Sequence, residues 1–269
     1  MTSAACPLTS GGAPDMQTVG FIGVGHLAEA LITGILRGSF PPHKLLLSPR
    51  GQAAHLGALH DLAIARDNAD VVARADIVVL CVRPKDAASA TSDLPWASRH
   101  VLVSACAGVP IAALEAAAAP ARVCRIMPLT AAALGASPTT LFPDIPEARD
   151  LIARFGSVIA LDRESDFEVA TVSAAVYGWA QDLIARSADW ASQRDLSPEA
   201  ARQLSALTFV AAGRLIAERP EAMDDLLRSV VTPGGITERG LNVLSERDVP
   251  AAWDAACEAV LHKLTGKGS

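Results

Sequence analysis

The feature that most constrains this chain is a short apolar run that meets a glycine-rich turn and then a helix. Val19–Ile22 is followed by Gly-x-Gly-x-x-Ala at residues 23–28, and helix-forming residues continue at once. Gly23 can take a backbone conformation closed to other residues, Gly25 lets the main chain approach a pyrophosphate, and Ala28 lets the helix pack closely on the strand. The unpaired N–H groups at the start of the helix then face the phosphates. The pattern predicts a dinucleotide-binding unit, although a bare match in a chain rich in Gly and Ala can also mark only a turn.

The end of the second apolar run indicates which dinucleotide is bound. This run covers residues 44–48 and is followed by Pro49 and Arg50. In NAD-binding folds an acidic side chain at this point takes the ribose hydroxyls, whereas a 2′-phosphate needs that charge absent and a cation nearby. This chain has Ser48 and Arg50 there, and no Asp or Glu. We therefore expect NADP(H) rather than NAD, the alternative being that Arg50 is an ordinary solvated residue of a loop.

Further apolar runs alternate with short helical segments along the first half of the chain. Residues 77–82 are continuously apolar, as expected for a strand that helices cover on both faces. Strands are also expected at residues 62–65, 101–104, 122–126 and 157–160, with helices at 52–59, 68–73 and 147–155. This alternation predicts a doubly wound parallel sheet, the Rossmann architecture.

The cofactor is expected along the carboxyl ends of these strands, where an open α/β sheet binds its ligand. Arg83-Pro84-Lys85 ends one strand there, and the small residues 105–108 after another would let a flat ring lie against the backbone. The residues expected to contact the cofactor are Gly23, Gly25, His26, Leu27, Ser48, Arg50, Asn68, Cys81, Val82, Arg83, Pro84 and Ala107.

The second half of the chain is expected to be entirely helical. Helices are expected at residues 166–192, 198–218, 222–230 and 250–264, with one more after Pro233-Gly234-Gly235. These Ala-rich helices are apolar on more than one face and cannot cover themselves, so a second subunit is expected to cover them. We thus expect a disordered extension over residues 1–16, a dinucleotide-binding Rossmann domain over 17–162, and an all-α dimerisation and substrate domain over 163–269. The assembly is expected to be a homodimer or a higher homo-oligomer.

Composition excludes several other classes of protein. Hydrophobic residues make up 51% of 269 residues, which supports a sizeable core. A net charge of −6 offers no general attraction to nucleic acid or to an anionic membrane surface, and no apolar run reaches membrane-spanning length. The first 15 residues lack the features of a signal peptide. Five cysteines without Cys-x-x-Cys spacing indicate buried thiols in a reducing compartment, so we expect a cytoplasmic protein without a metal site.

At this point the chain resembles one family, the pyrroline-5-carboxylate reductases. The matching stretches run in the same order in both, over residues 21–32, 79–85, 107–109, 125–128 and 231–237. The last, Val-Thr-Pro-Gly-Gly-Ile-Thr, is the most specific. In that family this segment starts a helix at the dimer interface and holds the substrate against the nicotinamide of the other subunit. The resemblance implies that Thr237 reaches the imine as the catalytic residue and that the substrate site also includes Thr232, Gly235 and Ile236.

Physical chemistry makes this assignment plausible. A helix N-terminus opened by Gly-Gly can bind the carboxylate of a substrate, although the same segment can also be a plain helix cap. Hydride attack on an iminium carbon needs the nicotinamide face, close positioning and one hydroxyl to the nitrogen. No Lys or His is required as a general acid, and none of the six histidines is assigned to catalysis.

Two departures from the family lie on the substrate side. The usual Met-Pro-Asn-Thr-Pro is here Met-Pro-Leu-Thr-Ala at residues 127–131, so Leu129 stands where an amide is expected. The usual Gly-Ser-Gly-Pro-Ala-Tyr at the start of the long helix is here replaced by residues 174–179, which include Tyr177 and Trp179. The altered pocket predicts a more apolar or differently shaped cyclic imine than pyrroline-5-carboxylate. Alternatively, Tyr177 and Trp179 only pack between helices and leave the pocket unchanged.

The leading hypothesis is therefore an NADPH-dependent reductase of the C=N bond of a cyclic imino acid. One alternative is a reductase of another imine, or an enzyme like the β-hydroxyacid dehydrogenases. That group relies on a lysine in its long interdomain helix, and residues 166–192 contain none. Another alternative is a non-catalytic NADPH-binding protein that has lost its substrate site.

Overall fold

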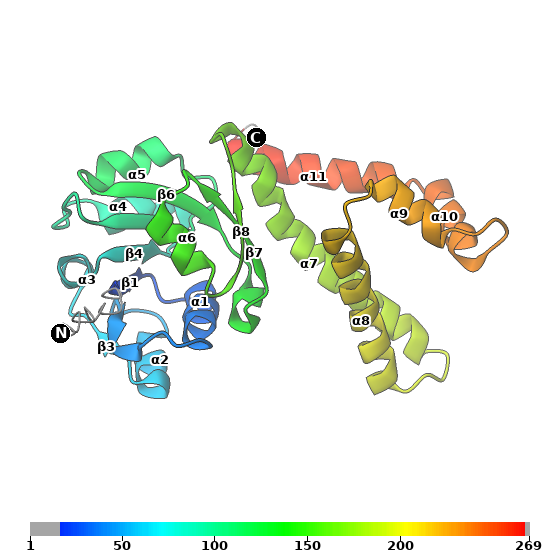
Figure 1. The fold of residues 1–269 in the computed structure, drawn as a ribbon, viewed down its shortest axis with the longest axis horizontal. Helices are drawn as coiled ribbons and strands as arrows, with labels where there is room; N and C mark the ends of the chain where they lie inside the picture. Colours follow the sequence, from blue (N-terminus) through cyan, green and yellow to red (C-terminus); the bar gives the residue numbers. More distant parts are fainter. Residues whose placement is uncertain (1–16, 267–269) are drawn as a thin grey trace, which may run out of the picture. The chain divides into compact units, whose positions relative to one another are not determined.

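The computed structural model describes residues 17–266 and divides them into two compact units (Figure 1). The first unit ends at Phe167 and the second begins at Glu168. The boundary expected after residue 162 precedes this division by five residues, because the first three residues of the long helix α7 (Ser165–Ser192) still belong to the first unit. The expectation for residues 1–16 falls outside the described residues.

The first unit is built on an eight-stranded sheet whose strand order is β3-β2-β1-β4-β5-β6-β7-β8. All neighbouring strands are parallel except β6 and β7. The strands are β1 (Val19–Ile22), β2 (Leu45–Leu47), β3 (Ala63–Ile64), β4 (Ile77–Leu80), β5 (Val101–Ser104), β6 (Arg122–Met127), β7 (Ser137–Phe142) and β8 (Gly156–Ala160). The order reverses between β1 and β4, and such a switch point is where doubly wound sheets bind ligands.

Strand β7 is the one strand that the sequence pattern does not predict. Its residues Ser-Pro-Thr-Thr-Leu-Phe contain a proline and three hydroxyl side chains in place of a continuous apolar run. The strand nevertheless pairs antiparallel with β6, with Ile126 opposite Leu141. Ser137 and Thr139 are fully buried, their hydroxyls hydrogen-bond to each other, and Ser137 Oγ also accepts from the Leu129 N–H of the preceding loop.

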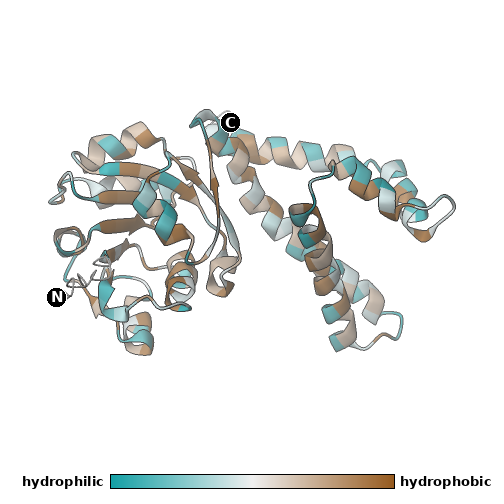
Figure 2. Cartoon of the chain, viewed as in Figure 1, coloured by the Kyte–Doolittle hydropathy of each residue, from teal (hydrophilic) through white to brown (hydrophobic). Residues whose placement is uncertain are grey.

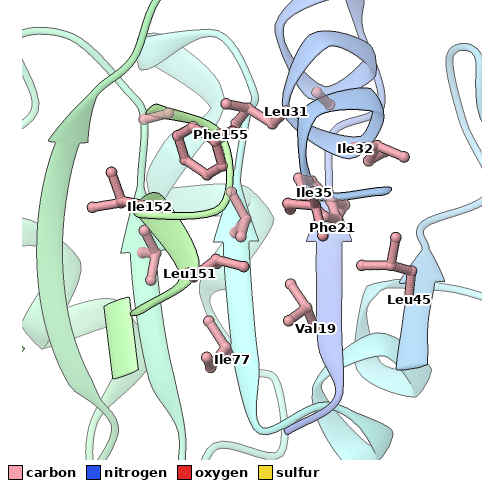
Figure 3. Close-up of a cluster of buried hydrophobic side chains, with 14 of the residues drawn as sticks. Val19, Phe21, Leu31, Ile32, Ile35, Leu45, Ile77, Leu151, Ile152 and Phe155 are labelled. Carbon is pink, nitrogen blue, oxygen red and sulfur yellow. The ribbon is translucent and has the colours of Figure 1, made fainter. Parts of the chain in front are cut away.

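Helices cover both faces of this sheet. On one face, α1 (His26–Leu36), α2 (Ala53–His60) and α6 (Pro146–Ile152) pack on alternate residues of the central strands. Figure 3 shows Leu31 and Ile35 of α1 above Phe21 of β1, with Phe155 beside them. The opposite face carries α3 (Asn68–Arg74), α4 (Ala87–Thr91) and α5 (Ile111–Ala118). The central strands are buried on both faces, as their continuous apolar sequence predicts.

The second unit contains only helices among residues 168–266. They are the remainder of α7, then α8 (Pro198–Glu218), α9 (Met223–Val230), α10 (Ile236–Glu246) and α11 (Val249–Thr265). The start of α8 lies where its sequence predicts it, because the Ser197 hydroxyl accepts a hydrogen bond of 3.3 Å from the Ala200 N–H and Pro198 occupies the first turn. Figure 2 shows apolar residues along the strands of the sheet and also over helices α8 and α9. No helix within residues 17–266 is long and apolar enough to cross a membrane.

Candidate functional site

A cavity of about 390 Å³ opens in the first unit at the switch point of the sheet. It is lined by the end of β1 and by the segments that follow β1, β2, β3 and β4. The lining residues are Ile22, Gly23, Ser48, Arg50, Asn68, Val82, Asp86, Ser89 and Ala90. Five of the residues expected to contact the cofactor are therefore brought together here: Gly23, Ser48, Arg50, Asn68 and Val82.

The glycine turn has the geometry that a phosphate-binding turn requires. Gly23 has φ +88°, and a Cβ at this position would lie 2.7 Å from the Val82 side chain and 2.8 Å from the Cys81 carbonyl group. A side chain is therefore excluded twice, by backbone strain and by contact with β4. Gly25 meets nothing within 4 Å of its would-be Cβ and precedes the first residue of α1. This open approach to a helix N-terminus fits the pyrophosphate of a dinucleotide.

Ser48 acts on the turn itself. Its side chain is buried, and its Oγ accepts a hydrogen bond of 3.1 Å from the Gly23 N–H. The hydroxyl thus holds the end of β2 against the glycine turn while it also lines the cavity. A bulky or acidic residue at this position would displace that contact.

Arg50 is exposed on the wall of the cavity and has no acidic partner among residues 17–266. The position of its loop depends on Gly51, which has φ +72° and lies so close to Val24 that any Cβ would overlap the Val24 carbonyl oxygen. The Gln52 N–H donates to the same oxygen at 2.8 Å. Gly51 was not among the expected site residues. The signal that could have indicated it is its position directly after Arg50 in a turn, since glycine is typical of turn positions with positive φ.

The third wall of the cavity joins two helices. The Asn68 Nδ2 donates to the Ala90 carbonyl at 3.1 Å, which ties the start of α3 to the end of α4. The Asp67 side chain caps α3 by accepting from the Asp70 N–H at 2.8 Å. Asp86, Ser89 and Ala90 also line the cavity, and the sequence pattern does not indicate them. The only sequence signal for these three residues is their position shortly after the carboxyl end of β4, the edge of the sheet at which such folds bind ligands.

The remaining expected contacts lie along the same edge of the sheet but do not line this cavity. Gly25 and His26 are exposed at the start of α1, Arg83 and Pro84 are exposed after β4, and Ala107 follows β5 half-buried. Leu27 and Cys81 are half-buried and pack against the core, so their side chains serve packing.

The thiols beside the cavity are held in their neutral form. Burial raises the pKa of both the Cys81 and the Cys106 thiols. The Cys106 Sγ donates to the Val82 carbonyl at 3.4 Å, which supports the backbone at the end of β4. Neither thiol is poised to act as a nucleophile, because the thiolate is the reactive form. Within residues 17–266 no group of His, Cys, Asp and Glu side chains could hold a metal ion.

The expected substrate segment forms the N-terminus of α10 in the second unit. Gly235 caps the helix, its N–H donates to the Thr232 carbonyl at 2.9 Å, and a Cβ at Gly235 would overlap the Thr232 side chain. The Gly234 N–H donates to the Glu238 carboxylate at 2.7 Å. These two N–H groups are therefore already bonded within the segment. Ile236 and Thr237 open the first turn of α10, where backbone N–H groups generally lack a carbonyl partner within the helix.

Both Ile236 and Thr237 are exposed, and Ile236 is 94% exposed. An isoleucine this open is suited to contact with another surface. Thr237 lies on the first turn of α10, and its expected catalytic role stays a prediction.

The two substrate-side departures have different surroundings. The Trp179 indole packs edge-to-face on the Trp253 ring of α11, with centroids 5.3 Å apart. This contact lies within the helical unit and favours the packing alternative for Trp179. Leu129 directly follows β6 and Pro128, is half-buried, and lies in the first unit on the cofactor edge of the sheet.

Comparison with known proteins matches the two units separately. Residues 18–108 match the family model described as NADP oxidoreductase coenzyme F420-dependent, and residues 164–266 match pyrroline-5-carboxylate reductase dimerisation. The pyrroline-5-carboxylate reductase of Glycine max is 30% identical over 242 residues, covering 86% of this chain and 88% of that protein. The enzyme of the same name from Pseudomonas aeruginosa is 28% identical, covering 90% of this chain and 93% of that protein.

Solved structures agree on the fold. A 1-pyrroline-5-carboxylate reductase from Streptococcus pyogenes has a TM-score of 0.81 at 23% identity, covering 93% of this chain and 98% of that one. The family resemblance seen in the sequence is confirmed by these matches, which together span both units. The chain belongs to the pyrroline-5-carboxylate reductase family.

Proposed function

We propose that this protein reduces the C=N bond of a cyclic imino acid with NADPH, and that the conversion of pyrroline-5-carboxylate to proline is the first reaction to test. The observation that carries the proposal is the cavity at the switch point, where the strained turn at Gly23 meets Ser48 and Arg50, and the open N-terminus of α1 follows this turn along the chain. The family relatives are named for this reaction. A related structure from Plasmodium falciparum holds NADP and has a TM-score of 0.80 at 24% identity, covering 94% of this chain and 98% of that one.

The residues of the cavity fit NADP(H). The space beside Gly25 admits a pyrophosphate that a Cβ would obstruct, and Arg50 supplies the cation for a 2′-phosphate where NAD-binding folds have a carboxylate. When bound, NADPH supplies a hydride to the imine carbon, while the C=N electron pair moves to the nitrogen, which takes up a proton to give the amine and NADP⁺.

The chain's own contribution is positioning. In this proposal the Thr237 hydroxyl, on the first turn of α10, donates to the imine nitrogen, which favours the form that accepts a hydride. The N–H groups of Ile236 and Thr237 offer a carboxylate the positive end of the α10 dipole. No ionisable side chain is needed as an acid.

We further propose that the protein acts as a homodimer in the cytoplasm. The dimerisation match over residues 164–266 supports a homo-oligomer, and the exposed apolar faces of the helical unit supply the surface for it. Cys81, Cys106, Cys124 and Cys257 are free thiols, as a reducing compartment allows.

The decisive experiment measures NADPH oxidation by the full chain with pyrroline-5-carboxylate and a small panel of other cyclic imines. Thr237→Val keeps the shape of the side chain and removes its hydroxyl, so kcat/KM should fall by about a hundredfold or more. Ser245→Ala removes an exposed hydroxyl from the far end of the same helix and serves as the control. A wild-type chain that binds NADPH but reduces no imine would instead support a non-catalytic protein, and an unchanged Thr237→Val would remove the role of Thr237.

A second candidate substrate class follows from Leu129. An apolar side chain after β6 favours a less polar imine, so the panel should include six-membered and alkyl-substituted imines. If pyrroline-5-carboxylate is the best of them by a wide margin, Leu129 does not alter specificity.

A further inference from the structure

The loop that carries Leu129 lies on the cofactor edge of the sheet. It connects β6 to the antiparallel β7, and the carboxyl end of β6 points the same way as those of β1, β4 and β5. The cavity occupies the side of the glycine turn toward β2, α3 and α4. A dinucleotide with one half in that cavity extends its other half toward β5 and β6, and hence toward Leu129.

Two buried hydroxyls hold the backbone of Leu129. The Leu129 N–H donates to Ser137 Oγ at 2.8 Å, and Ser137 Oγ lies 2.9 Å from Thr139 Oγ1. Both hydroxyl side chains are fully buried. Ser137 therefore accepts from Leu129 and can donate to Thr139, while Thr139 can donate weakly to the Ser137 carbonyl at 3.4 Å. A buried hydroxyl with both of its functions satisfied fixes one geometry for the groups around it.

The loop is also fastened from the side of α1. The Leu129 carbonyl accepts from the Ala132 N–H at 3.0 Å, and the Ala136 N–H donates to the Ala131 carbonyl at 3.1 Å. Gly34 of α1 lies so close to this turn that a Cβ there would overlap the Ala132 carbonyl oxygen. Since α1 begins at the glycine turn, Leu129 is held at a set position relative to the phosphate-binding residues.

We propose that Ser137 is a positioning residue that fixes the backbone of Leu129 at the nicotinamide end of the site, and that this pair decides which imine the protein reduces. This inference rests on the proposed function. Ser137 touches neither substrate nor cofactor and acts only through Leu129.

The test compares selectivity rather than activity. Ser137→Ala removes the acceptor of the Leu129 N–H. The ratio of kcat/KM for the best other cyclic imine of the panel to kcat/KM for pyrroline-5-carboxylate should then change by about three- to tenfold, the range of one net hydrogen bond. Thr140→Val is the matched control, because Thr140 is a buried hydroxyl on the same strand whose Oγ1 has no partner among the described residues. A loss of folded protein lowers both kcat/KM values equally and leaves their ratio unchanged. Leu129→Asn, which keeps the N–H, should shift the ratio toward pyrroline-5-carboxylate.

Hydrogen exchange of the Leu129 amide supplies a readout that does not depend on activity. The amide should be protected in the wild type and in Thr140→Val and should exchange faster in Ser137→Ala. Equal protection in all three overturns the positioning role. If the wild type is active and Ser137→Ala has the same selectivity ratio, the role of Ser137 in specificity is overturned. A wild type that reduces no imine contradicts the proposed function and the specificity role together. In that case hydrogen exchange still tests whether Ser137 holds the Leu129 amide.

Discussion

The two units of the chain differ in how completely they bury their apolar side chains. In the first unit every residue of β1, β4 and β5 is buried, and helices cover both faces of these central strands. Among residues 168–266, by contrast, Val172 and Ala201 are the only buried apolar side chains. Large exposed ones include Trp190, Leu204, Leu207, Val210, Met223, Leu227 and Ile236.

This difference separates two sources of stability. A sheet covered on two sides completes its own core, because each apolar face has a helical layer of the same chain against it. Helices that are apolar on several faces leave part of their apolar surface exposed to water. That surface contributes to stability only when another subunit buries it. The first unit should therefore respond to changes in its internal contacts, and the second to changes in assembly.

The difference between the two units can be tested by placing the same substitution, Leu to Glu, in each of them. Leu207→Glu puts a charge on the exposed face of α8, where the side chain is 64% exposed in the single chain. Burying that carboxylate in an interface is unfavourable by several kcal/mol, so the oligomer should dissociate at micromolar concentration. Sedimentation or light scattering measures the mass.

Leu59→Glu is the control for this prediction. Leu59 lies on α2 of the first unit and is 61% exposed, so it matches Leu207 in residue type and in accessibility. Its substitution should leave the mass unchanged. Dissociation by both variants, or by neither, would contradict the division between the units.

The next largest effect is expected inside the first unit. Arg125 of β6 is 2% exposed, its Nη1 donates to Glu164 Oε1 at 3.1 Å, and its guanidinium lies 4.2 Å from the centre of the Phe167 ring. Glu164 also accepts from the Ile111 N–H at 2.8 Å. Arg125→Ala should lower the free energy of unfolding by about 2–4 kcal/mol, because it removes a charge-assisted hydrogen bond and the packing of a buried side chain, while Glu164, whose side chain is 35% exposed, can be rehydrated.

Arg122→Ala provides the comparison on the same strand. Arg122 pairs with Glu147 at the surface, and its side chain is 47% exposed. Exposed ion pairs contribute about 0–1 kcal/mol, so this variant should unfold at nearly the wild-type denaturant concentration. If the two arginine variants lose equal stability, burial does not decide the strength of these contacts.

The effect on the cofactor should be smaller and confined to affinity. Arg50→Ala removes a charge-assisted contact of about 1.5–3 kcal/mol, so the Kd for NADPH should rise about tenfold or more while that for NADH barely changes. Arg74→Ala, which removes a cation paired with Asp70 outside the cavity, should change neither value. Calorimetry measures both cofactors, and equal losses for NADPH and NADH would remove Arg50 from the 2′-phosphate site.

The smallest effect concerns the dependence of stability on pH. His100 is fully buried before β5, and its Nδ1 accepts from the Ala97 N–H at 2.9 Å. Burial, reinforced by the nearby Arg99, lowers the pKa of this imidazole from its ordinary value of 6.5. Below about pH 7 the imidazole therefore takes up a proton in the unfolded chain but stays neutral in the folded chain. The free energy of unfolding should fall as the pH drops from about 7 toward the lowered pKa, by at most about 1.4 kcal/mol per pH unit.

His100→Asn keeps an acceptor near the Ala97 N–H and cannot titrate in this range. The midpoint of denaturant unfolding should therefore depend less on pH between 5 and 7 in the variant than in the wild type. An identical pH profile for the two proteins would show that His100 titrates alike in the folded and unfolded chains.

Much of the fold could be predicted from local patterns. The glycine turn, the continuous apolar strands and the cap at Ser197 each depend on residues that are neighbours in the chain. Long helices such as α7 were predictable for the same reason, because their pattern repeats over many turns. Strand β7 was not, since its hydroxyl side chains are buried by partners that lie in another segment.

The candidate site divides in the same way. The sequence alone predicted the type of ligand and the edge of the sheet expected to bind it, because a phosphate-binding turn needs glycines at set spacings and a 2′-phosphate needs a cation in place of a carboxylate. Only the tertiary structure decided that Ser48 supports the turn, that Asp86 and Ser89 complete the cavity, and that Ser137 holds Leu129. These contacts join residues distant in the chain, and hydrogen-bond geometry at that separation is set by how strands and helices pack rather than by the local preference of either residue.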